Sequence, residues 1–294
     1  MTAATDDDDF GWLTIPLRSF NLPANGAQNQ AVFEAVYRVC ADNQELLAFA
    51  SPVDYSVIND GNYVSAYKLR VPVDVIGWKE KRAEIWDTIA KINTYVADET
   101  GFELTALPET AEERIEVAVA LHNWLIENVS NNAGAATSGY WTHNAYSCLT
   151  RATPRYSDCS GFSAAYQWLC QLFGINCIQV MGGVGGDTSI GGATSERINH
   201  SWNMLAPELP RGKFEATASK WYAVDVRFDQ YVKDGKVKIN GSAVTDTNRY
   251  CMTSYVYNDT EGTTVNGHNY TERANNAVGY PVGTPSGAIG GNTA

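Results

Sequence analysis

The chain has no run of eighteen apolar residues among its 294 positions, so we expect no membrane-spanning helix. Positive charge is also scarce, because 21 Lys and Arg residues stand against 33 Asp and Glu residues, a formal net charge of −12. No basic stripe offsets this balance. Nucleic acid is a polyanion that binds basic surfaces, so we predict no nucleic-acid partner. The net negative charge is more simply explained by acidic side chains on a solvent-exposed surface.

Several short motifs are missing as well. No spacing of Cys and His matches a zinc site, and the Gly-rich run at 182–192 lacks the Gly-Lys-Ser/Thr ending of a phosphate-binding loop. We therefore predict neither a metal nor an organic cofactor. Residues 1–10 contain no basic and apolar leader, and we expect them to be disordered.

The chain does contain an ordered set of three reactive residues. Cys159 lies in SDCSGFSAAYQWLCQLFGI (157–175), His200 in INHSWNML (198–205) and Asp225 in KWYAVDVRFD (220–229). A thiol needs a base to remove its proton, and the base needs a carboxylate to orient it. The order predicts a cysteine nucleophile served by a histidine and an aspartate.

The segment around Cys159 is typical of a helix. Apolar residues from Phe162 to Phe173 recur with helical spacing, Asp158 or Ser157 is a suitable N-cap, and Gly174 is a suitable stop. Cys159 is thus expected in the first turn, where the helix dipole favours a thiolate.

The other two windows have the alternation of strands. Around His200 the apolar residues alternate with polar ones, and the run from Trp221 to Phe228 also reads as strand. A hairpin of these strands would place His200 beside Asp225, with the helix of Cys159 packed against the sheet.

The stretch from about Glu112 to Asp229 resembles the transglutaminase-like superfamily, the papain-like group of Cys-His-Asp proteins, and in particular its bacterial secreted branch. The motifs that carry the resemblance are ALHNWL (120–125), CSGFS (159–163), LFGINC (172–177), HSWN (200–203) and WYAVDVRFD (221–229). In the last motif Arg227 replaces the usual Thr, and we expect it not to touch the three reactive residues.

The resemblance implies an α+β fold, in which a helix with the cysteine packs on an antiparallel sheet with the histidine and aspartate, plus an N-terminal α/β region. It also implies acyl transfer or hydrolysis on protein or peptide amides, as in a transglutaminase, protease or deamidase. Cys159 is then the nucleophile, His200 the base and Asp225 its orienting group. The alternative is a non-catalytic binding or adhesion module of a bacterial surface protein. Either reading suggests a secreted or cell-surface location.

The expected organisation has four parts. An N-terminal α/β region at 11–105 follows residues 1–10, the catalytic core spans 106–275, and a linker-like tail covers 276–294. We predict helices at 30–40, 79–97 and 111–129, and a hairpin turn at 59–62.

Several further residues have expected roles. Tyr146, with Trp141 as second choice, is a candidate side-chain donor to the oxyanion of an acyl-transfer site. Aromatic residues near it, with Trp202 and the Gly-rich run as a lid, would form a cleft for an extended peptide. We expect His122 to be structural. Among the remaining cysteines, Cys170 and Cys177 are expected to be buried thiols, whereas Cys40, Cys148 and Cys251 are undecided.

Overall fold

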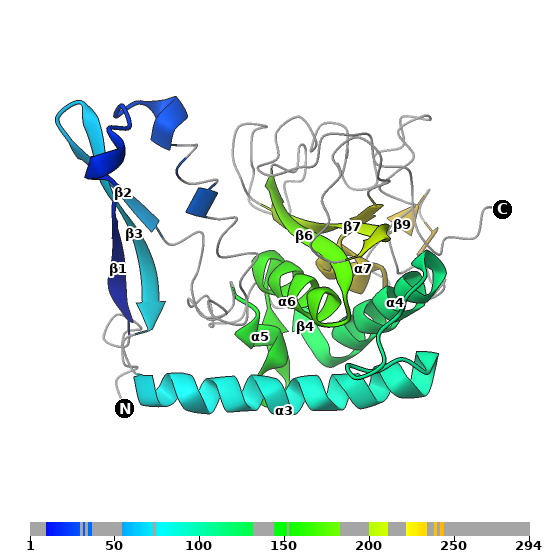
Figure 1. Cartoon of the computed structure of the whole chain (residues 1–294). Coiled ribbons are helices and arrows are strands. Elements are labelled where there is room, and N and C mark those ends of the chain that lie inside the picture. Colours follow the sequence, from blue (N-terminus) through cyan, green and yellow to red (C-terminus); the bar gives the residue numbers. More distant parts are fainter. Residues whose placement is uncertain are drawn as a thin grey trace.

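The computed structural model describes residues 10–29, 32, 35–36, 55–72, 75–131, 144–151, 153–182, 200–210, 222–233, 238–239 and 242–243. These residues form a mixture of helices and strands, consistent with an α+β transglutaminase-like fold (Figure 1). The helices are α3 (Val75–Thr100), α4 (Ala111–Asn128), α5 (Tyr146–Leu149), α6 (Cys159–Leu172) and α7 (Val226–Lys233), with a short 3-10 helix η1 (Arg18–Phe20). The strands are β1 (Phe10–Pro16), β2 (Tyr55–Asp60), β3 (Tyr63–Pro72), β4 (Val129–Asn131), β5 (Arg155–Ser157), β6 (Ile175–Gly182), β7 (His200–Pro210), β8 (Tyr222–Val224), β9 (Lys238–Ile239) and β10 (Ser242–Ala243).

The N-terminal sheet is antiparallel with the strand order β1-β3-β2. In Figure 1 it stands apart from the remaining strands, at the N-terminal end of α3. Gly61 adopts a φ of 59° in the turn between β2 and β3, a left-handed conformation that glycine adopts without strain. The predicted hairpin is confirmed. In the predicted helix at 30–40, the described residues Val32, Ala35 and Val36 are helical.

The two long helices confirm the predictions at 79–97 and 111–129. Along α3, residues Ile85, Ile89, Ile92 and Val96 are buried with helical spacing and form one face of the core. Helix α4 begins with a capping box. There the Glu113 N–H donates to Thr110 Oγ1 at 3.2 Å, and the Thr110 N–H donates to Glu113 Oε2 at 2.8 Å.

The sheet that positions the site is antiparallel with the order β6-β7-β8. Its register pairs Gly182 with His200 and Asn203 with Val224. Helix α6 packs on β6 and β7 and also contacts α4 (Figure 1). Residues 160 to 171 of α6 are all buried, because neighbours cover the helix on every side.

The strand predicted around Asp225 is shorter than expected. Strand β8 ends at Val224, and α7 begins at Val226 where the alternation indicated more strand. The Asp229 N–H donates to the Asp225 carbonyl at 2.9 Å and closes the first turn of this helix. A run of only a few alternating residues fits the two-residue period of a strand and also the 3.6-residue period of a helix. Here the burial of Val226 and Gln230 in the core favours the helix.

Among the described helices, none is both long and apolar enough to cross a membrane.

Candidate active site

Cys159 is the first residue of α6, as predicted. Asp158 is the N-cap, and its Oδ1 accepts hydrogen bonds from the N–H groups of Ser160 at 2.9 Å and Gly161 at 3.0 Å. At the other end Gly174 has a φ of 74° after the last turn. Both signals that the sequence offered for this helix are confirmed.

The thiol of Cys159 lies against the start of β7. The backbone N–H of Ser201 donates a hydrogen bond to the sulfur. Ser201 directly follows His200, whose backbone begins the strand opposite Gly182. The His200 side chain is outside what the structure describes. The backbone therefore brings the predicted nucleophile to within one residue of the predicted base.

Asp225 approaches the same thiol from the third strand. It directly follows β8 and is 1% exposed. Its negative charge raises the pKa of Cys159, so the carboxylate lies within electrostatic range of the sulfur. Cys159 and Asp225, 66 positions apart in the chain, are thus close in the fold.

The pKa of Cys159 differs from the expectation. Burial raises it to about 11, and the charges of Asp158 and Asp225 add to this, whereas Arg227 and the Ser201 N–H lower it. A helix N-terminus was expected to favour the thiolate. The N-cap Asp158 explains part of the difference, because its carboxylate occupies two of the free N–H groups and adds a negative charge next to the thiol. Burial of the thiol therefore opposes the thiolate that the helix N-terminus was expected to favour.

Arg227 was predicted not to touch the three reactive residues, and this stays a prediction. It is buried in the first turn of α7, and its positive charge lowers the pKa of Cys159. The residue that departs from the family motif is thus one of the charged groups acting on the thiol.

A neutral polar network lies beneath the first turn of α6. The Gln179 amide on β6 donates to Ser163 Oγ at 2.6 Å, to Ser201 Oγ at 3.0 Å and to the Ser160 carbonyl at 3.1 Å. The two serine hydroxyls are 2.7 Å apart, and Ser163 Oγ also donates to the Cys159 carbonyl at 2.8 Å. The sequence analysis missed this network, although both serines lie in the motifs CSGFS and HSWN. The network fixes the helix of Cys159 against the strand of His200.

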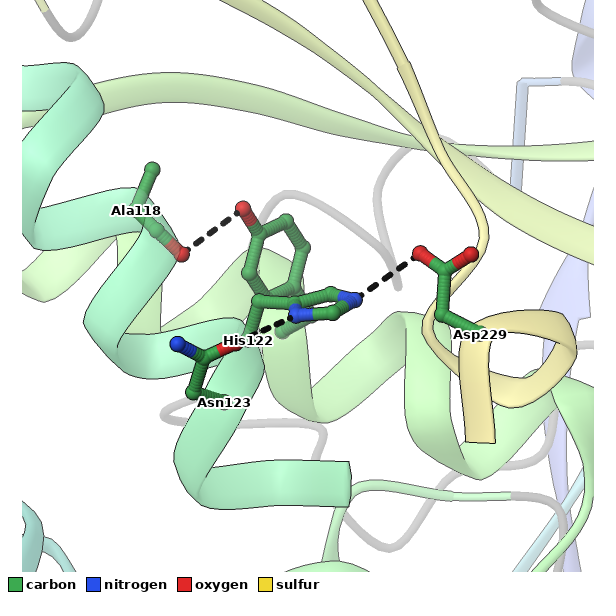
Figure 2. A network of polar contacts seen from close by, with 5 residues as sticks. Ala118, His122, Asn123 and Asp229 are labelled. Carbon is green, nitrogen blue, oxygen red and sulfur yellow. Dashed lines mark hydrogen bonds and ion pairs between the residues drawn. The ribbon is translucent and has the colours of Figure 1, made fainter. Parts of the chain in front are cut away.

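A buried histidine–aspartate pair lies on the other side of α6. His122 Nε2 on α4 is 2.9 Å from Asp229 Oδ2 on α7, and the two side chains are 0% and 1% exposed (Figure 2). His122 Nδ1 is 3.1 Å from Asn123 Oδ1. Because an ionised carboxylate only accepts hydrogen bonds, Nε2 carries a proton in its contact with Asp229. The buried position agrees with the predicted structural role of His122, but its partner was not foreseen.

The remaining cysteines are buried thiols. Cys148, Cys170 and Cys177 are free and at most 1% exposed, as predicted for the last two. Burial raises the pKa of Cys148 to about 12, which removes it as a competing nucleophile. Cys40 and Cys251 lie outside the described residues.

The predicted aromatic cleft is not built from Trp202, which is 1% exposed and packs in the core. Tyr146 is half-buried, and its hydroxyl donates to Glu84 Oε2 at 3.0 Å. Its role as an oxyanion donor stays a prediction. Tyr140, Trp141 and the Gly-rich run after Gly182 lie outside the described residues. Within the described ranges, no three His, Cys, Asp or Glu side chains are grouped to hold a metal ion.

Comparison with known families agrees with this geometry. Residues 98–226 match the family model described as the transglutaminase-like superfamily. The matched stretch begins in the last turn of α3 and ends on the first residue of α7, so it includes Cys159, His200 and Asp225. No curated protein sequence matches the chain. Over residues 98–226 the chain is thus similar to the transglutaminase-like superfamily, and the match selects no branch of it.

Proposed function

We propose that this domain is a cysteine acyltransferase or hydrolase acting on protein or peptide amides, with Cys159 as nucleophile, His200 as base and Asp225 as its orienting group. The observation that carries the proposal is the packing of the first turn of α6 on the start of β7, where Ser163 Oγ donates to the Cys159 carbonyl at 2.8 Å and lies 2.7 Å from Ser201 Oγ. It supports a thiol held beside the strand of His200. The nearby buried Asp225 is the carboxylate that such a site needs.

The raised pKa of Cys159 decides how the proposed reaction would start. Because burial raises the pKa of Cys159, His200 would remove the proton as the sulfur attacks the amide carbonyl. The C–N bond then breaks, His200 returns the proton to the leaving amine or ammonia, and a thioester remains on Cys159. Water or a primary amine attacks the thioester carbonyl and restores the thiol.

The proposal is tested on a glutamine-rich unfolded protein such as casein, incubated with and without a biotin-labelled primary amine. Biotin incorporation identifies a transglutaminase and chain cleavage a protease, while a mass gain of about one dalton identifies a deamidase. Cys159→Ala should abolish the reaction. Cys170→Ala, which removes a buried thiol from the same helix, should retain it.

Two outcomes would contradict the proposal. One is turnover that survives Cys159→Ala. The other is no product under any condition together with a Cys159 that iodoacetamide does not modify, a result that favours the binding module.

A further inference from the structure

We propose that the buried pair His122–Asp229 is a positioning device, which holds the first turn of α7 so that Asp225 and Arg227 stay against Cys159. The functional meaning of this inference rests on the function proposed above. His122 and Asp229 would act through their neighbours and touch no reacting atom.

The first step in the argument is the path from Asp229 to the thiol. Asp229 lies one helical turn after Asp225, and its N–H donates to the Asp225 carbonyl at 2.9 Å. Whatever fixes Asp229 therefore fixes the peptide of Asp225 as well. Arg227 lies between the two in the same turn, and both Asp225 and Arg227 act electrostatically on Cys159.

The second step is that His122 is itself held rigidly. The Tyr166 ring of α6 meets the imidazole edge to face, with centroids 6.5 Å apart and an interplanar angle of 86°. The Tyr166 hydroxyl donates to the Ala118 carbonyl of α4 at 3.2 Å (Figure 2). Helix α6 also carries Cys159. The same helix therefore contacts both the site and His122, the residue that holds α7 through Asp229.

The third step is energetic. Both side chains of the pair are buried, and a buried charge that loses its partner is strongly penalised. Displacing α7 relative to α4 would break the 2.9 Å contact. The pair therefore resists that displacement more strongly than a neutral or apolar contact of the same area would.

The chain offers a matched control on the same helix. Arg114 is buried on α4, and its guanidinium donates to the Pro207 carbonyl at 3.0 Å and to the Glu109 carbonyl at 2.6 Å. It ties α4 to the far end of β7, away from His200. Arg114→Gln thus breaks a buried polar tie of α4 without altering the anchor of α7.

The experiment measures iodoacetamide alkylation of Cys159 against pH, by mass spectrometry, in the full chain and in three variants. His122→Gln keeps an amide donor near the Nε2 position but removes the charge, and Asp229→Asn keeps the volume. Of the charges of Asp225 and Arg227, that of Arg227 is the stronger influence on Cys159 and favours the thiolate. Loosening α7 should therefore move the alkylation midpoint of Cys159 upward, by roughly half a pH unit or more, and slow alkylation at pH 8 about threefold or more.

The buried thiols of Cys148, Cys170 and Cys177 report on folding in the same samples. An upward shift for Cys159 in both pair variants, with these three still protected and Arg114→Gln unchanged, supports positioning. The inference is overturned by an unchanged or lowered midpoint, by an equal shift in Arg114→Gln, or by loss of protection of all the thiols in parallel. Because alkylation needs no substrate, this result is independent of the turnover test, which alone decides the proposed function.

Discussion

Two buried polar connections surround the nucleophile helix, and they are built differently. The connection through Gln179, Ser163 and Ser201 is neutral, and it joins α6 to β6 and β7. The connection through His122 and Asp229 sets a buried carboxylate against an imidazole, an ion pair when the ring is protonated, and it joins α4 to α7. The neutral network holds Cys159 against the strand of the predicted base, whereas the ion pair holds the turn that carries the predicted orienting carboxylate.

The difference teaches where each arrangement is vulnerable. A neutral hydrogen bond contributes about 1 kcal/mol net, and several partners share the loss when one is removed. A buried ion pair contributes little net stability, but removing one member leaves an uncompensated charge. We therefore expect that removing one member costs less stability in the neutral network than in the ion pair.

The largest expected effect comes from breaking the ion pair. Asp229→Ala should lower the free energy of unfolding by about 3–5 kcal/mol, because it leaves a charged or desolvated His122 in the core. The double variant His122→Phe with Asp229→Leu should recover most of this loss, since no buried charge remains. Urea denaturation at pH 7 measures both. A double variant less stable than Asp229→Ala would contradict the charge argument.

A smaller effect is expected from the neutral network. Gln179→Leu should cost about 1–3 kcal/mol, because the hydroxyls of Ser163 and Ser201 lose a shared donor. Adding Ser163→Ala and Ser201→Ala should restore much of the stability by removing the polar groups left behind. Gln171→Leu is the control, because the Gln171 amide donates to the Cys177 carbonyl at a longer 3.4 Å, away from Ser201. An equal loss of unfolding free energy in the Gln171→Leu control would contradict a particular contribution of the Gln179 network to stability.

Much of the fold could be predicted because its signals are local. The capping box of α4, the N-cap and terminal glycine of α6, and the alternation in β7 each depend on residues a few positions apart. Helix α7 was missed because its first four residues fit both a strand and a helix. Short segments of this kind take the structure that tertiary contacts impose.

The places of Cys159, His200 and Asp225 on their elements could largely be predicted, their catalytic roles stay predictions, and the energetics around Cys159 could not be predicted. The pairing of His122 with Asp229 joins positions 107 apart, and no local pattern indicates it. The raised pKa of Cys159 sums burial and charges from three elements, so the helix dipole alone predicted the wrong direction. The domain boundaries, the role of the His200 side chain and the location outside the cell stay predictions.

The charge of the N-cap Asp158 can be tested through its effect on the pKa of Cys159. Asp158→Asn keeps a capping oxygen for Ser160 and Gly161 but removes the negative charge that raises the pKa of Cys159. The pKa should fall, and alkylation of Cys159 at pH 8 should speed up severalfold, because each pKa unit changes the thiolate fraction about tenfold. The free energy of unfolding should change by only about 0.5 kcal/mol. Slower alkylation would show that the cap acts mainly by holding the helix.

The smallest effect is expected at Arg227, and its sign is opposite. Arg227→Met keeps an apolar stem of similar length but removes the positive charge that lowers the pKa of Cys159. The pKa should rise, so alkylation at pH 8 should slow. The change should be smaller than that of Asp158→Asn, because Asp158 is the stronger influence on the thiol. Alkylation profiles of both variants and of their combination measure this, and the combination should fall between the two single variants. If Arg227→Met speeds alkylation, the guanidinium does not act on the thiol by its charge, and the ion pair of His122 and Asp229 would position Asp225 alone.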